Sequence, residues 1–190
     1  MANVSAPLGF KPERRLDGAA WTGAVASYRI ASGYSTSIYN GDVVKLINTG
    51  YLNRAGAGDQ MRGIFIGCEY TNAAGQRIKS PYWPASVTTL ASQDVTAFVI
   101  DDPNMVFEAQ MNAAATIPAD LGANFNIVAT AGSAATGLSA EQLDYSTLTT
   151  SAAQFRLIEV VSRPDNDPTS AYAKVLVAPA LHDFRVNTGI

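Results

Sequence analysis

Residues 155–178 read FRLIEVVSRPDNDPTSAYAKVLVA, and this stretch predicts the class of fold. Two runs rich in β-branched and aromatic residues, Phe155–Val161 and Tyr172–Ala178, flank the turn-forming segment Arg163–Pro168. Proline fixes φ and asparagine tolerates the left-handed region, so such a segment reverses the chain. We therefore expect the two runs to pair as an antiparallel hairpin.

The same pattern extends outward in both directions. Val95–Ile100 and Met105–Gln110 flank Asp102-Pro103-Asn104 and predict a second hairpin. Other short β-rich runs separated by turn residues are Ala24–Ile30, Val43–Ile47, Tyr51–Arg54, Arg62–Tyr70, Arg77–Ser80 and Phe125–Ala129. Short strands at this spacing favour an all-β fold, mainly an antiparallel small barrel or sandwich.

The chain divides into three parts by composition. Residues 1–23 hold prolines, glycines and unperiodic apolar residues, which predicts an extended N-terminal arm, docked either on a partner or across its own sheet. Residues 24–178 form a single β-rich domain, and residues 179–190 a C-terminal tail. Within the domain, residues 130–153 are rich in Ala, Ser, Thr and Gly and predict a long surface loop. Very little helix is expected, at most one turn each at 118–122 and 139–143.

Composition excludes several classes. The 190 residues are 47% hydrophobic but only 15% charged, against about 25% in an average soluble protein, so we expect a partner to cover part of the surface. No apolar run approaches the ~20 residues of a membrane span, and no signal peptide is visible. We expect no membrane association and synthesis inside a cell. The net charge is −3, without the dense basic stripe of a nucleic-acid-binding protein.

No set of residues predicts catalysis, a metal or another cofactor. The single histidine, His182, lies in the expected tail, where a general base would lack a fixed partner, so we expect a surface or interface residue. The single cysteine, Cys68, is expected to be a small buried apolar residue. Asp101, Asp102 and Glu108 do not follow a calcium-loop spacing, and a turn explains the two aspartates.

Several residues are instead suited to contact a partner protein. The arm offers the apolar residues Leu8, Phe10 and Trp21 beside the basic residues Lys11, Arg14 and Arg15. Tyr82-Trp83, held between Pro81 and Pro84, is either an exposed aromatic pair or a loop folded over the end of the barrel. The candidate interface residues are Leu8, Phe10, Lys11, Arg14, Arg15, Trp21, Tyr82 and Trp83.

Several blocks, taken in order, resemble one family. They are Ser5–Pro12, Ile38–Leu46, Gly63–Tyr70, Ser80–Pro84, Val99–Asn104, Asp120–Asn124 and Arg163–Asn166. With them, the chain resembles the head decoration (cement) proteins of tailed bacteriophages. The resemblance covers most of residues 1–178, through turn and strand blocks rather than catalytic signatures.

The resemblance implies a virion protein that binds the outer surface of the expanded capsid and joins neighbouring capsomers. It implies the major capsid protein as partner, self-association as a trimer or dimer, and no enzymatic activity. On this basis, removal of residues 2–20 is expected to leave a soluble fold that no longer loads onto capsids. Two alternatives stay open: a tail, fibre or head-surface module that binds host glycan through Tyr82, Trp83 and the 101–104 loop, and a hydrolase.

Overall fold

The computed structural model describes residues 3–114 and 119–186. It is all-β, with 43% strand and 2% helix, and its strands form two antiparallel sheets of six strands each. The sequence-based prediction of an antiparallel all-β fold is confirmed. The helix that the structure describes is a single 3-10 turn, Leu90–Ser92.

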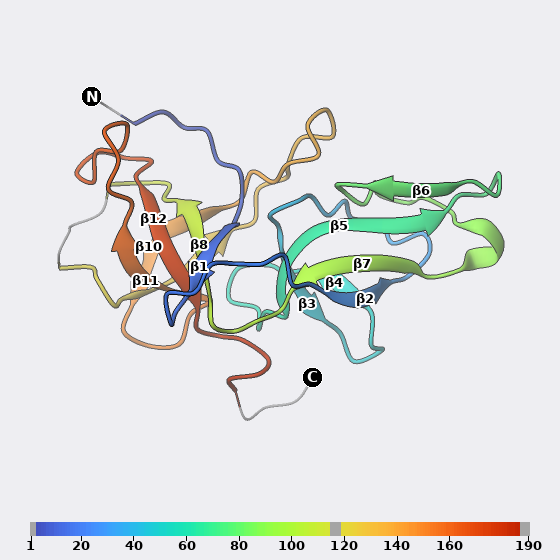
Figure 1. The fold of residues 1–190 in the computed structure, drawn as a ribbon, viewed down its shortest axis with the longest axis horizontal. Helices are drawn as coiled ribbons and strands as arrows, with labels where there is room; N and C mark the ends of the chain where they lie inside the picture. Colours follow the sequence, from blue (N-terminus) through green and yellow to red (C-terminus); the bar gives the residue numbers. More distant parts are fainter. Residues whose placement is uncertain (1–2, 115–118, 187–190) are drawn as a thin grey trace.

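The first sheet is built from a contiguous part of the chain, residues 26–100, in the order β2-β7-β5-β3-β4, with β6 also paired to β5. Its strands are β2 Ala26–Ile30, β3 Val43–Leu46, β4 Leu52–Arg54, β5 Gly63–Thr71, β6 Arg77–Ser80 and β7 Val95–Ile100. The long strand β5 lies in the middle, and the β5–β6 hairpin reaches the right-hand end of the molecule in Figure 1.

The second sheet has the order β1-β8-β12-β11-β9-β10. Its strands are β1 Lys11–Arg15, β8 Met105–Gln110, β9 Asn124–Val128, β10 Gln142–Thr149, β11 Phe155–Val160 and β12 Lys174–Pro179. The predicted 155–178 hairpin is present, because β11 pairs with β12 from Phe155↔Pro179 to Val160↔Val175.

Both sheets curl. In the second sheet, the end strand β10 returns to the end of β8 through a parallel bridge between Met111 and Leu143, and the Asn112 amide donates to the Leu143 carbonyl at 3.0 Å. In the first sheet, the β2 and β4 edges also approach each other. Each sheet is therefore rolled toward a small barrel.

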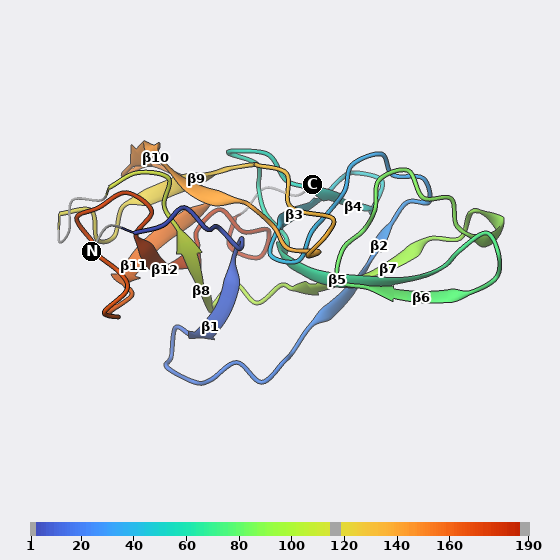
Figure 2. The same ribbon diagram turned by 90° about the horizontal axis from the view of Figure 1, so that it is seen from above.

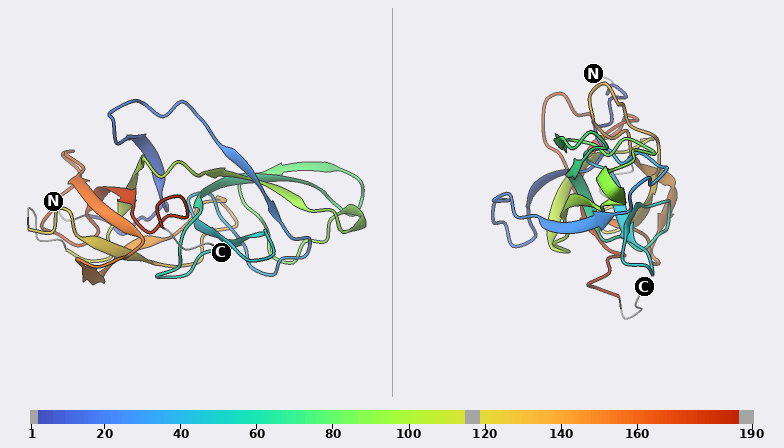
Figure 3. Two further views of the ribbon diagram at one scale, coloured as in Figure 1. Left: turned by 90° about the horizontal axis from the view of Figure 1, so that it is seen from below. Right: turned by 90° about the vertical axis from the view of Figure 1, so that its right-hand side faces the viewer.

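The two sheets lie one beyond the other along the long axis (Figures 1 and 3). One buried cluster fills the first sheet, around Phe65, Trp83 and Val99. A second cluster fills the other sheet, around Phe107, Phe125 and Phe155, and includes Val43, Ile64 and Ile100 from the first sheet. The two halves consequently share apolar contacts at their junction.

The predicted hairpin between Val95–Ile100 and Met105–Gln110 is wrong. The turn is real, because the Asp102 carboxylate accepts the Asn104 amide at 2.8 Å, but it carries the chain from β7 in one sheet to β8 in the other. Both strands are central and apolar, so each needs partners on two sides. β7 finds them in β2 and β5, and β8 in β1 and β12.

The long loop predicted at 130–153 is partly wrong. Residues 142–149 form β10, which pairs with β9, and the helical turn expected at 139–143 is replaced by the start of this strand. Leu143 is buried and Tyr145 is half-buried, so apolar side chains do occupy alternate positions at the start of this strand. The Ser and Thr residues that follow hide this period-two pattern in the sequence. The turn expected at 118–122 lies partly outside the described residues, and residues 119–122 form a turn.

The described parts of the expected arm and of the expected tail both contact the sheets. Residues 11–15 of the expected arm form β1 against β8, which is the second of the two arrangements that the sequence left open. In Figure 2 the β1–β2 connection runs from one sheet to the other along the lower side of the molecule. In the expected tail, the Met61 amide donates to the Leu181 carbonyl at 3.0 Å and the Asp183 amide to the Met61 carbonyl at 3.0 Å, so the tail also ties the two halves together.

Candidate interaction surface

The N-terminal segment, residues 3–25, lies along the second sheet and supplies its edge strand β1. The register runs from Lys11↔Glu108 to Arg15↔Met105, with an irregularity between Pro12 and Arg14. Pro12 lacks an amide hydrogen, and an edge strand tolerates this because one side of the strand needs no partner. Toward its C-terminal end β1 also pairs with the following turn, where Arg14 bridges Ala20 and the Arg15 amide donates to the Ala19 carbonyl at 2.8 Å. The open part of the edge is therefore the Lys11 end, which is blunted by proline and by charge.

Large apolar side chains are exposed on this segment. The exposed fractions are 75% for Val4, 56% for Leu8 and 40% for Leu16. Single exposed apolar residues are ordinary, but several on one segment are typical of a contact surface. Leu8 belongs to the sequence-predicted set, whereas Val4 and Leu16 were not singled out by the sequence.

The three predicted basic residues differ in their pairing. Arg14 lies 3.3 Å from Glu159, and Arg15 lies 2.8 Å from Asp102. Lys11 is exposed and forms no ion pair among the described residues. Exposed ion pairs contribute only about 0–1 kcal/mol, so Arg14 and Arg15 can exchange their carboxylates for those of a partner at little cost.

Trp21 is half-buried. It packs against the core of the second sheet, and its indole nitrogen lies 3.4 Å from the Ala24 carbonyl oxygen that accepts its hydrogen bond. The buried part of the ring attaches the β1–β2 connection to the sheet, and the rest of the ring is accessible to solvent.

Phe10 must be removed from the candidate interface. Its side chain is 1% exposed and lies in the core of the second sheet. The sequence grouped it with Leu8, but the backbone turns between them, because Gly9 has φ +70°. The Leu8 side chain is consequently exposed to solvent, whereas the Phe10 side chain enters the core.

Trp83 must also be removed. It is fully buried, its indole nitrogen donates to the Tyr34 carbonyl at 3.1 Å, and its backbone bonds to Ile38 in both directions. Tyr82 is half-buried and stacks on Tyr39 with ring centroids 5.4 Å apart. The flanking prolines correctly indicated a non-strand segment, but this segment is folded over its own sheet. A sugar platform built on Trp83 would therefore lose its main aromatic.

His182 is not the surface residue that the sequence predicted. It is fully buried, and its Nδ1 accepts the Phe184 amide at 3.1 Å. Burial lowers the pKa of this imidazole, because the charged form is desolvated. Its position beside Met61, across the junction of the halves, explains the burial.

The remaining sequence-predicted groups have structural partners. Cys68 is buried as expected, and desolvation raises the pKa of its thiol to about 12. Asp101 accepts the Tyr28 hydroxyl at 2.6 Å, which occupies the carboxylate beside the Asp102 turn. Among the described residues, no three His, Cys, Asp or Glu side chains are grouped for a metal ion.

A buried charged cluster at the junction was missed by the sequence analysis. Arg54 lies 3.1 Å from Asp42 and 2.8 Å from Glu141, and both carboxylates are fully buried. Asp42 and Arg54 belong to the first half, whereas Glu141 precedes β10 of the second. One guanidinium faces two carboxylates, and burial raises the pKa of both acids, that of Glu141 to about 8. The cluster links the halves, and no sequence spacing marks it because its members are 12 and 87 residues apart.

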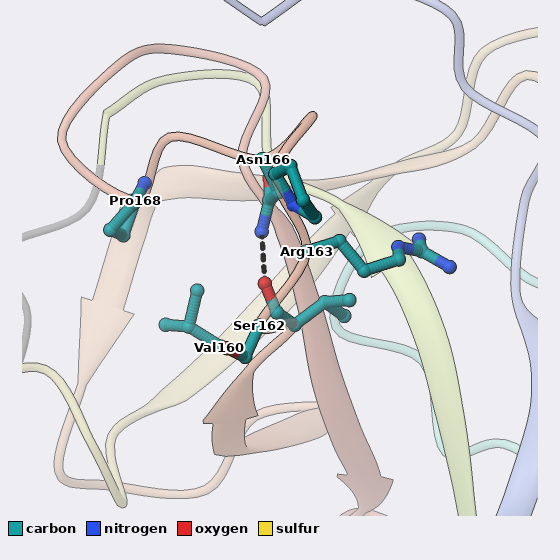
Figure 4. Close-up of a pocket in the computed structure, with 7 residues that line it drawn as sticks. Val160, Ser162, Arg163, Asn166 and Pro168 are labelled. Carbon is teal, nitrogen blue, oxygen red and sulfur yellow. Dashed lines mark hydrogen bonds between the residues drawn. The ribbon is translucent and has the colours of Figure 1, made fainter.

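A surface depression of about 420 Å³ lies between β11 and the loop that leads to β12 (Figure 4). Val160, Pro164 and Pro168 line it, and the Asn166 amide closes the loop by donating to the Val161 carbonyl at 2.8 Å. The guanidinium of Arg163 extends away from this depression and pairs with Glu108 at 2.5 Å. Ser162, Arg163 and Asn166 also line the depression, so it offers polar as well as apolar contacts.

Comparison with protein-family models, with curated proteins and with solved structures finds no match to this chain. Among the described residues, the structure contains no helix long and apolar enough to cross a membrane.

Proposed function

We propose that this protein is a virion structural protein that binds the outer surface of an expanded phage capsid and cements neighbouring capsomers. Its partners are the major capsid protein and further copies of itself, as a homotrimer or alternatively a dimer. It is made in the host cytoplasm, acts on the outside of the head, and needs no catalysis, cofactor, nucleic acid or membrane.

The observation that carries the proposal is the surface of the N-terminal segment. Val4 and Leu8 expose apolar area, and Lys11, which lines one small hollow together with Leu8, places a positive charge on the open end of the β1 edge. Apolar contacts supply roughly 25 cal/mol per Å² buried, while charge complementarity orients the partner. This combination fits an acidic protein surface.

The buried contacts between the two sheets also support a structural role. A protein that works by fitting needs a stiff body, and here the sheets share core residues, backbone hydrogen bonds and a buried charged cluster. A ligand that binds only the expanded lattice stabilises it by mass action, so several weak contacts per copy are sufficient.

The test uses purified expanded heads that lack the protein. Wild-type protein is expected to co-sediment with these heads and to raise the temperature at which they release DNA. The variant Val4→Ser, Leu8→Ser, Lys11→Glu is expected to remain folded, because all three side chains are exposed, and to load at least about tenfold less, which corresponds to 1.4 kcal/mol.

A control carries changes of the same kind elsewhere, two exposed apolar side chains to serine and one lysine to glutamate: Leu90→Ser, Leu121→Ser and Lys79→Glu. The two leucines are 40% and 44% exposed, and the Lys79 side chain is 80% exposed. The control is expected to load like the wild type. Absence of loading by the wild type would contradict the capsid proposal, and equal loss in both variants would contradict the role of the N-terminal segment.

A further inference from the structure

A second surface lies on the outer face of the second sheet, away from Val4 and Leu8. It is a groove of about 310 Å³ lined by Leu16, Arg156, Ile158, Ala178, Pro179, Ala180 and Arg185. The floor is formed by the paired ends of β11 and β12, where Arg156 lies opposite Ala178 in the register. One wall is formed by Leu16 and Arg185, which meet at Asn104.

Asn104 fixes this wall through two hydrogen bonds. Its carbonyl accepts the Leu16 amide at 2.8 Å, and its side-chain oxygen accepts Arg185 Nη2 at 2.9 Å. Arg185 Nη1 also donates to the Pro179 carbonyl at 2.9 Å. Hydrogen bonds to backbone and side-chain atoms therefore fix the shape of this wall of the groove.

The charge of the groove is unusual for this molecule. Of the 13 lysines and arginines, all but Lys11, Arg156 and Arg185 form an ion pair within the part of the chain that the structure describes. Two of these three residues line the same groove. Arg156 bonds only to the neutral Asn124 side chain, at 3.1 Å, and both arginines are exposed.

Two carboxylates that are close in sequence to residues of the groove are already engaged. Glu159, next to Ile158 on β11, pairs with Arg14 at 3.3 Å, and Asp17 pairs with Arg15 at 3.5 Å. A guanidinium presents planar donors that match a carboxylate in a bidentate geometry. The other side chains that line the groove are apolar, so the groove combines two guanidinium groups with apolar side chains.

We propose that this groove binds a segment of a partner protein in which acidic residues flank one or two apolar side chains. The inference rests on the proposed function only for the identity of that partner, a subunit of the shell. The chemistry of the occupant follows from the groove itself: carboxylates pair with Arg156 and Arg185, and the apolar side chains cover Leu16, Ile158 and Ala178.

The test uses a blocked hexapeptide in which two aspartates flank two leucines, titrated into the full-length ¹⁵N-labelled protein. Chemical-shift changes are expected at the Nε–H groups of Arg156 and Arg185 and at the amides of Ile158 and Ala178. The same peptide with asparagine in place of aspartate is expected to bind at least about tenfold more weakly, since hydrogen bonds to an ionised carboxylate are stronger than those to a neutral amide oxygen.

The matched variants are Arg156→Ala with Arg185→Ala, and Arg29→Ala with Arg77→Ala as the control. The groove variant is expected to lose at least about tenfold in peptide affinity, while the control, which removes two exposed arginines of the first sheet, binds as the wild type does. If the groove variant does not fold, the comparison of the two peptides on wild-type protein still decides the question.

Four outcomes would overturn the inference. They are no shift at the groove residues at millimolar peptide, equal binding of the asparagine peptide, equal shifts with inorganic phosphate alone, and a self-association that the groove variant abolishes, which would make a second copy the occupant. The experiment contains no capsids. Its failure therefore leaves the loading experiment intact, and a failure of loading leaves the peptide result standing.

Discussion

The ring of Phe10 lies nearly parallel to the ring of Phe155, with centroids 4.2 Å apart and an angle of 7° between the planes. Phe155 begins β11, so this contact places the start of the chain in the core of the second sheet. Offset or parallel aromatic pairs add about 0.5–1.5 kcal/mol to the burial of each ring. The N-terminal segment is thus part of the fold as well as of the candidate surface.

Phe10→Ala is expected to lower the free energy of unfolding by about 3–5 kcal/mol, because it leaves a cavity beside Phe155. Leu8→Ala, two residues away and largely exposed, is expected to change it by less than about 0.5 kcal/mol. Urea unfolding followed by circular dichroism measures both. By the same reasoning, removal of residues 2–20 will destabilise the protein rather than leave the intact soluble fold expected from the sequence. Equal stability of Phe10→Ala and wild type would refute the placement of this ring.

Gly9→Ala is expected to destabilise the fold by at least about 2 kcal/mol. Gly9 has φ +70°, and an added Cβ would lie 2.5 Å from the Gly41 carbonyl oxygen, which accepts the Phe10 amide. Gly18→Ala is the control, since φ is +86° there but no atom lies within 4 Å of the added carbon. Its cost is then only that of the backbone conformation, about 1 kcal/mol. Thermal unfolding of both variants separates the two contributions, and equal costs would show that the approach to Gly41 is unimportant.

The two tryptophans are expected to differ in fluorescence. Trp21→Phe leaves the fully buried Trp83, which should emit at short wavelength and resist quenching by acrylamide. Trp83→Phe leaves the half-buried Trp21, which should emit at longer wavelength and be quenched several-fold more strongly. Readily quenched emission from Trp21→Phe would show that Trp83 is exposed, as in the first of the two arrangements that the sequence left open for Tyr82-Trp83.

Stability is expected to fall as the pH rises between about 4.5 and 8, because the folded pKa of Glu141 is raised from 4.5 to about 8. In that interval the folded protein holds a proton that the unfolded chain has released, so the stabilising contribution is present below pH 4.5 and lost above pH 8. Glu141→Gln removes this titration. Unfolding in urea at a series of pH values should therefore give a flatter profile for this variant.

His182 acts in the opposite direction. Its lowered pKa means that the unfolded chain binds the extra proton first, so stability contributed by the neutral imidazole is lost as the pH falls below about 6.5. The difference between wild type and Glu141→Gln cancels this contribution, since both proteins contain His182. A difference that does not decrease with pH between 4.5 and 8 would contradict a protonated Glu141 in the folded state.

Local pattern was sufficient to predict most strands. Met105–Gln110, Val95–Ile100 and the two strands of the 155–178 hairpin follow from β-rich runs bounded by turn residues, and all four strands are present. Pairing across long separations was not predictable in this way. Asp102 and Asn104 specify a turn, but whether the flanking strands pair depends on what else competes for them, and β1 and β12 are far away in the sequence.

The candidate surface was predictable only in part. Leu8 and Lys11 were found because apolar and basic residues gather on one segment without a strand or helix pattern. Phe10 was misassigned because a single positive φ at Gly9 reverses the side-chain direction, and a sequence without an alignment does not show φ. Arg156 and Arg185 were missed for a related reason: an arginine without a carboxylate nearby can be recognised only when all neighbours are placed.

The position of β12 has a consequence for synthesis on the ribosome. The first sheet is encoded contiguously and can complete its hydrogen bonding while the rest of the chain is still being translated. The second sheet cannot, because β12, which emerges after the five other strands of this sheet, is inserted between β8 and β11. Until then two strand edges stay unsatisfied and open to other nascent chains. A stop codon shortly before Lys174 would therefore leave an aggregation-prone product.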